Sequence, residues 1–349
     1  MNSLVWLRAL VLSAAAVALT GCDKSVPISN IAQHIDSLDE GSKIREIERL
    51  IKENLGQHPE LVKALLEIQP ENLRRHAIVI FIRRLSERNA QAGLDAAGRL
   101  PAGNLRTNAY NDVFQVMPSS EWLESLNKVK REGLPEELDA AISGVRKGVD
   151  RISAEDAISV AKAFADSYSD VAESAAAHAG RQASSEPNKN FLEVAGSLPI
   201  EEAKAYLWGV VFGQLNVAPA SAADFWKTIP PELTLGGQVH MEIAESWATR
   251  DPRAALDWAG KLSGSASISS QAAGVAMISW LRRDFVAAST WAKEHSPQNQ
   301  RTVAIASVIN FLLSKNDSVG AGEWLPLIGD PAARERMAAR ISDGVSSNR

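Results

Sequence analysis

The chain has 349 residues, of which 45% are apolar and 23% are charged, and this composition excludes an intrinsically disordered protein. The formal net charge is −5, and charges of both signs are mixed along the length without a basic stripe. This pattern argues against nucleic acid, or an anionic membrane face, as the partner. The length suits two domains or one elongated array.

The first 21 residues have the layout of an export signal. Arg8 precedes an apolar run, Ala9 to Leu19, which is too short to span a bilayer as a mature helix. The run leads into Leu19-Thr20-Gly21-Cys22, which contains the only cysteine of the chain. These residues resemble the signal peptide and lipobox of bacterial lipoproteins. The resemblance implies cleavage before Cys22 and acyl chains, palmitate among them, on the mature protein. The alternative is an unlipidated export signal with an unrelated cysteine.

The same resemblance implies an address in the cell envelope. The protein is expected to face the periplasm and to be held at a membrane through lipid on Cys22, because two acyl chains already anchor a protein stably. Asp23 is similar to the inner-membrane retention signal of enteric lipoproteins, so the inner membrane is favoured over the outer membrane. Residues 22–30 contain Ser25, Pro27 and Ser29, which predict a short tether.

Residues 31–150 predict a helical region with irregular repeats. Apolar residues at helical spacing mark one amphipathic helix near its start: Ile44, Ile47, Ile51 and Leu55. The segment 89–100 echoes the segment 251–262 further along the chain. The two glycines within 144–150 indicate a break between two regions. Ser153 and Asp156, just beyond it, resemble a capping box with Asp in place of Glu.

Residues 151–349 predict helical repeats, because three columns of residues recur every 33 positions. The columns are Trp247, Trp280 and Leu313; then Asp251, Asp284 and Asp317; then Trp258, Trp291 and Trp324. One step earlier the match is weaker, with Pro219 aligned to Pro252 and Phe225 aligned to Trp258. Each aspartate stands where an N-cap is expected, and Asp251 is followed by a proline suited to the first helical position.

Each 33-residue unit predicts a hairpin of two helices. In one unit, Ala255, Trp258, Ala259 and Leu262 share a face of the first helix. The second helix, from about Ser269 to Arg283, presents Ala273, Ala276, Met277 and Trp280. Units of this period resemble the tetratricopeptide class over about 186–343, although the Gly-x-x-Tyr of that class is missing. No segment alternates with period two, so we expect an all-α fold, an α-solenoid of helical hairpins with a repeat of about 33 residues.

The sequence contains no recognisable catalytic or metal-binding pattern. Its six histidines show no metal-ligand spacing, and no Gly-rich phosphate loop or Gly-x-Ser-x-Gly elbow occurs. The acidic pairs Glu136-Glu137 and Glu201-Glu202 follow prolines, where acids in the first turn of a helix are expected from the helix dipole. We therefore expect no enzyme, no catalytic residue, no metal and no cofactor.

The exposed face of the first helices is the predicted partner-binding surface. Its candidate residues are Lys227, Arg253, Asp257, Lys261, Lys293 and Glu294. The regular step of the tryptophans places them in the core between repeats. We expect an interaction or scaffold lipoprotein that binds an envelope protein or peptide, whose identity the sequence does not give. Two alternatives stay open: a small-ligand or carbohydrate binder that uses surface tryptophans, and an all-helical carbohydrate-active enzyme.

Overall fold

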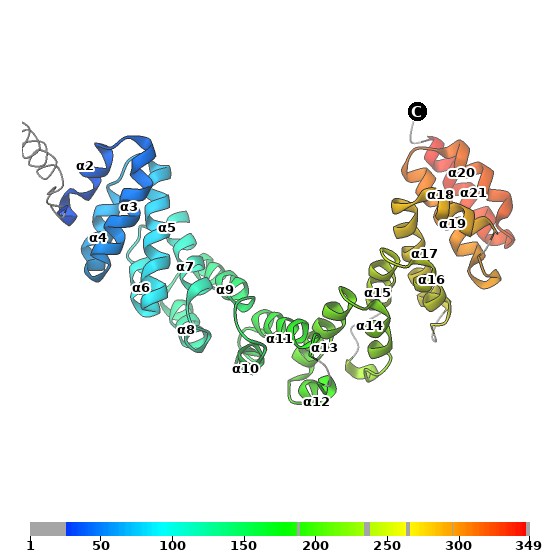
Figure 1. The fold of residues 1–349 in the computed structure, drawn as a ribbon, viewed down its shortest axis with the longest axis horizontal. Helices are drawn as coiled ribbons and strands as arrows, with labels where there is room; N and C mark the ends of the chain where they lie inside the picture. Colours follow the sequence, from blue (N-terminus) through cyan, green and yellow to red (C-terminus); the bar gives the residue numbers. More distant parts are fainter. Residues whose placement is uncertain (1–25, 187–188, 234–237, 263–265, 295, 347–349) are drawn as a thin grey trace, which may run out of the picture. The chain divides into compact units, whose positions relative to one another are not determined.

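The computed structural model describes residues 26–186, 189–233, 238–262, 266–294 and 296–346. Within these ranges the protein consists of α-helices and short 3-10 turns, with no strand (Figure 1). The predicted all-α fold, an α-solenoid of helical hairpins, is confirmed. The signal segment, Cys22 and Asp23 lie outside the described residues.

The chain divides into two compact units, one ending at Gly148 and one beginning at Val149. We call them the N-terminal and the C-terminal unit. The helices of the N-terminal unit are α2 (Ile31–Asp36), α3 (Glu40–Asn54), α4 (His58–Leu66), α5 (Glu71–Arg88), α6 (Ala90–Gly98), α7 (Asn104–Val116), α8 (Trp122–Glu132) and α9 (Pro135–Val149). Apolar residues on facing sides form its core, including Ile47, Leu61, Phe81 and Phe114, which are fully buried.

The C-terminal unit continues the series of hairpins. Its helices are α10 (Ala154–Phe164), α11 (Ser169–Ala183), α12 (Phe191–Gly196), α13 (Ile200–Leu215), α14 (Pro219–Trp226), α15 (Gln238–Ala248), α16 (Pro252–Gly260), α17 (Ala266–Arg283), α18 (Phe285–Glu294), α19 (Gln298–Ser314), α20 (Ser318–Trp324) and α21 (Pro331–Ser346). In each hairpin an even-numbered first helix is followed by an odd-numbered second helix (Figure 1).

The hairpins keep the predicted 33-residue register. The first helices α14, α16, α18 and α20 begin at Pro219, Pro252, Phe285 and Ser318. The aspartate before each of the last three is an N-cap. Its Oδ1 accepts a backbone N–H from Ala254 at 3.1 Å, from Ala287 at 3.0 Å and from Gly320 at 2.8 Å, respectively. Each cap satisfies one of the N–H groups that a helix start leaves without an intrahelical partner.

A second contact repeats with the same period. Arg250 donates hydrogen bonds to the backbone carbonyls of Asn216 and Val217, which follow the end of α13. Arg283, 33 positions later, donates to the carbonyl of Thr249, just past the end of α15. A guanidinium at the end of a helix satisfies free carbonyls and complements the negative end of the helix dipole. Each arginine therefore ties its own hairpin to the preceding one.

The N-terminal helices are more regularly spaced than the sequence predicts. The first helices α4, α6, α8 and α10 begin at His58, Ala90, Trp122 and Ala154, which is a step of 32 residues. Of the residues predicted as a tether, 22–30, the described Ile28–Asn30 form a 3-10 turn, and the following Ile31 is fully buried.

The predicted break within 144–150 coincides with the boundary between the two units at Gly148 and Val149, although α9 continues to Val149. Its glycines serve packing. A Cβ on Gly144 would lie 2.3 Å from the carbonyl oxygen of Asn111, and a Cβ on Gly148 would lie 2.8 Å from the ring of Trp122. Both distances are too short for real atoms, so these glycines permit a close approach of helices that a larger residue would prevent.

The tryptophans lie between neighbouring helices, as the 33-residue step predicts, with one exception. Trp258 and Trp291 are 7% and 6% exposed, and each packs against the tryptophan of the preceding second helix. The ring centroids are 6.1 Å apart for Trp247 and Trp258, and 5.8 Å apart for Trp280 and Trp291. The expectation that Trp324 is equally buried is wrong, since it is only partly buried. Its partner column holds the smaller Leu313.

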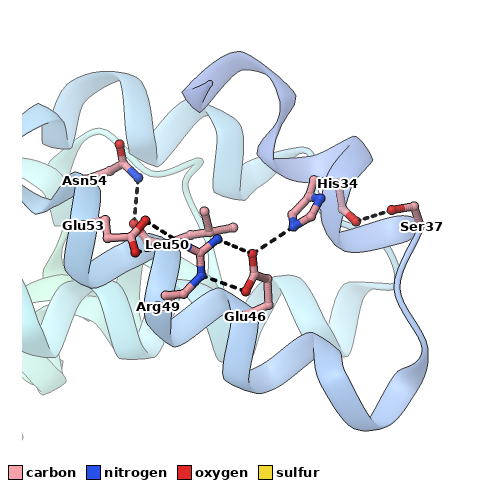
Figure 2. A network of polar contacts seen from close by, with 7 residues as sticks. All are labelled: His34, Ser37, Glu46, Arg49, Leu50, Glu53 and Asn54. Atoms are coloured by element: carbon pink, nitrogen blue, oxygen red, sulfur yellow. Dashed lines mark hydrogen bonds and ion pairs between the residues drawn. The ribbon is translucent and has the colours of Figure 1, made fainter. Parts of the chain in front are cut away.

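Charged residues join α2 to α3 at the start of the N-terminal unit (Figure 2). Glu46 accepts hydrogen bonds from Arg49 at 2.6 and 2.9 Å, and its carboxylate lies 2.8 Å from Nε2 of His34. Arg49 also binds Glu53, one helical turn further on. The hydrogen bonds from Arg49, assisted by His34, lower the pKa of Glu46 to about 2 against the opposing effect of burial.

Replacing Trp291 tests the repeat core. Trp291→Ala is expected to lower the free energy of unfolding by about 3–5 kcal/mol, because deleting a buried aromatic side chain leaves a cavity. Trp324→Ala, in the equivalent but only partly buried position, is the matched control and should cost clearly less. Urea unfolding followed by circular dichroism measures both. A loss below about 1 kcal/mol for Trp291→Ala would contradict the assignment of this column to the core.

Acid titration tests the contact between α2 and α3. Since the folded-state pKa of Glu46 lies below its ordinary value of 4.5, its stabilisation is present above that pH and is lost as the pH falls towards 2. Glu46→Gln should therefore cost about 1 kcal/mol at neutral pH, the upper end for a partly exposed ion pair. The difference from wild type should shrink as the pH is lowered. A difference that stays constant with pH would show that the carboxylate charge is not responsible.

Candidate functional site

The second helices of the C-terminal unit line an open groove of about 460 Å³. Four successive second helices, α15, α17, α19 and α21, contribute to it, and none of the first helices does. The apolar side chains along it are Met241 from α15, Val275 and Ile278 from α17, Val303 and Ala306 from α19, and Met337 from α21. Small polar residues, among them Ser267, Ser270 and Thr302, lie between them.

The groove exists because α17 and α19 are apolar on two faces. One face of α17, with Ala273, Ala276 and Met277, is buried against neighbouring helices. A second face, with Val275 and Ile278, is only half-buried and lines the groove. An amphipathic helix of a globular protein needs a single apolar face. A second one left partly in water is a surface that a partner can cover.

The middle of the groove is hollow because small residues occupy equivalent positions there. Met241, Gly274 and Ser307 follow one another at the 33-residue step, so that large side chains on α15 and α21 flank small ones on α17 and α19. A Cβ on Gly274 would touch nothing closer than Val303 Cγ1 at 3.8 Å. The glycine is thus not required by packing, and its missing side chain leaves open space.

Charges of opposite sign lie on α15 and α21, the two outer helices that contribute to the groove. On α15, Glu242 lies next to Met241, and Glu245 follows it by one turn. Burial, and then the nearby charge of Glu245, raise the pKa of Glu242 above its ordinary value. Arg336 lines the groove from α21. Among the described residues none of the three forms an ion pair. In addition, Oδ1 of Asn310 is buried in the groove lining without a hydrogen-bond partner in the described part of the chain.

The residues predicted to bind a partner lie on the other helices of the hairpins. All six are exposed, on or directly after α14, α16 and α18: Lys227, Arg253, Asp257, Lys261, Lys293 and Glu294. Lys227 and Lys293 occupy equivalent positions two repeats apart, and Lys227 pairs with Asp224 at 2.9 Å. None of the six lines the groove. Sequence reasoning missed the groove because it assigned each second helix only one apolar face. The signal was present in the additional apolar pair Val275 and Ile278.

A second hollow, of about 370 Å³, lies among α6, α7, α8 and α9 in the N-terminal unit. Its most buried charged group is Glu137, which is 3% exposed. One carboxylate oxygen lies 3.0 Å from Nε of Arg106, and the other accepts the backbone N–H of Leu134 at 3.1 Å. Arg106 in turn donates to the carbonyl of Gly98 at the end of α6. Glu137 is therefore a first-turn acid, as predicted, which also holds Arg106 between two helix ends.

Arg106 and Glu137 thus have a structural role in joining helix ends. Within the described ranges, no group of three or more His, Cys, Asp or Glu side chains is arranged to hold a metal ion. None of the helices in those ranges combines the length and apolarity needed to cross a bilayer. Comparison of the chain with protein-family models, with curated proteins and with solved structures finds no match.

Proposed function

We propose that this protein is a membrane-anchored interaction protein that faces the periplasm and binds a segment of another envelope protein in the groove of the C-terminal unit. The observation that carries the proposal is the half-buried apolar lining shared by four successive second helices. A solenoid presents an extended surface of this kind in place of an enclosed pocket. Apolar grooves between helices are a recurrent way of binding a helical peptide.

The burial of the tryptophans favours this function over binding of a carbohydrate. Trp122, Trp226, Trp258, Trp280 and Trp291 are each less than a tenth exposed. A sugar stacks on an aromatic face that is open to solvent, and these faces are covered by neighbouring helices. The binding surface that remains is aliphatic, and aliphatic side chains suit the apolar face of a protein segment.

The anchor in this proposal is lipid on Cys22, in the inner membrane in preference to the outer membrane because of Asp23. Tethering confines the groove to a layer near one membrane. Tethering therefore raises the effective concentration of the groove for partners near the same membrane, without any additional contact. The partner is thus a protein of the envelope, and no nucleic acid or cofactor takes part.

Site-specific photo-crosslinking tests where the partner binds. A photoreactive amino acid at Val303, on α19 in the groove, is expected to trap one defined envelope protein in living cells. The same residue at Arg253 or Lys293, on the first helices, should trap little of it. The trapped product is measured by immunoblot and identified by mass spectrometry. Trapping mainly from Arg253 and Lys293 would transfer the site to the first helices, and trapping from neither surface would contradict an interaction function.

The anchor is tested by intact-mass analysis. The mature wild-type protein is expected to begin at Cys22 and to carry acyl chains. Cys22→Ser should give an uncleaved or soluble form that no longer partitions into detergent, because the acyl chains supply the membrane affinity. A wild-type mass without lipid on Cys22 would refute the lipid anchor but would leave the groove untouched.

A further inference from the structure

We infer that the occupant of the groove is an amphipathic α-helix that places a bulky apolar side chain over Gly274 and carries charges of opposite sign at its two ends. This inference rests on the proposed function, which assigns the groove to a protein segment. It adds the chemistry of that segment, argued in turn from the hollow, the backbone requirements and the flanking charges.

The hollow selects a large apolar side chain. Gly274 and Ser307 leave open space between Met241 on one side and Met337 on the other. The walls of that space are aliphatic, with Val275, Ile278 and Val303 as neighbours. A Leu, Met or Phe side chain inserted there is removed from water on most sides, which is the main source of affinity in such grooves.

The lining favours a helix over an extended peptide. An extended chain exposes backbone N–H and C=O groups that need partners when they are covered. The groove has few to offer, because its lining is mainly apolar and the hydroxyl of Ser307 already donates to the carbonyl of Val303 at 2.9 Å. A helix satisfies its backbone internally and presents only side chains to the groove.

The flanking charges define the ends of the occupant. Glu242 and Glu245, one helical turn apart on α15, give the α15 side a negative potential. Arg336 makes the α21 side positive. A segment with a Lys or Arg at one end and an Asp or Glu at the other complements both sides at once. Packed helices are about 8–10 Å apart, so a segment that crosses from α15 to α21 is about 24–30 Å long, or roughly 16–20 helical residues.

Two synthetic peptides test this chemistry on the full mature chain with Cys22→Ser, which avoids detergent. Both have about 18 residues and the same leucine face, but one has two lysines at one end and the other has two glutamates there. Both are expected to bind, as followed by fluorescence anisotropy at low ionic strength. Arg336→Gln should weaken the glutamate peptide about fivefold and leave the lysine peptide unchanged. The double variant Glu242→Gln, Glu245→Gln should do the opposite, and high salt should remove both effects.

Two further comparisons test the hollow and the helix. Gly274→Leu fills the space above α17 and should weaken both peptides at least about tenfold, as expected for losing a buried apolar anchor. Gly322→Leu is the matched control on the first helix α20, where a Cβ has nothing within 4 Å, and should leave binding intact. A proline at the centre of either peptide should abolish binding, because it breaks the helix.

Three results would overturn the inference. They are equal binding of the proline peptides, equal effects of Arg336→Gln on the glutamate and lysine peptides, and the failure of both peptides to bind. If the peptides fail while the photoreactive residue at Val303 still traps a partner, the proposed function stands and only the chemistry of the occupant is wrong. If the peptides bind as expected but trapping occurs from the first helices, the groove is a peptide site that the partner does not use.

Discussion

The packing of each hairpin against the next is the constraint on which the rest of the structure depends. A hairpin of two short helices cannot bury its apolar face alone, so stability comes from stacking. From α14 onward this stacking uses three recurring contacts: an aspartate cap before α16, α18 and α20, a pair of tryptophans between α15 and α16 and between α17 and α18, and an arginine, Arg250 or Arg283, that reaches the end of the preceding second helix. Because these contacts recur at one period, the second helices form a continuous row.

The candidate site is a consequence of that row. Helices in the middle of a stack are covered by neighbours on both sides, so α17 and α19 need apolar residues over a wider arc than a helix at the edge of a globule. The groove lies where this arc extends beyond the neighbours, and small residues at Gly274 and Ser307 deepen it. In the N-terminal unit, the hollow among α6, α7, α8 and α9 is occupied in part by charged side chains. There Arg106 and Glu137 fill the space between helix ends with an ion pair that holds α6, α7 and α9 together.

The fold was predictable from the sequence wherever large or polar side chains marked the repeat. Asp251, Asp284 and Asp317, together with the tryptophans, define helix starts and hairpin contacts that the structure confirms. The N-terminal hairpins were harder to recognise, because the cap column there holds Gln57, Asn89, Glu121 and Ser153 in place of aspartate. Gly144 and Gly148 marked the boundary between the two units, but their role in helix packing could not be predicted. A glycine that ends a helix and a glycine that lets two helices approach look alike until the neighbouring chain is known.

The groove was missed because burial on a second face of a helix depends on which helices lie alongside it. The spacing of apolar residues within one helix does not reveal those neighbours.

The regular step of 33 residues has a consequence for how such a chain changes over generations. Because the hairpins around α16 and α18 begin and meet at equivalent positions one period apart, duplicating or deleting a whole 33-residue unit there would preserve both the aspartate cap and the contact between two large side chains. Each added unit would also lengthen the row of second helices by one helix, and with it the length of the segment that can bind. An insertion of one or two residues within a helix, by contrast, rotates every following residue of that helix around its axis. The residues that pack against the neighbouring hairpin then no longer face it. The length of the bound segment can thus change by one repeat unit at a time, while each unit keeps the same kind of binding surface.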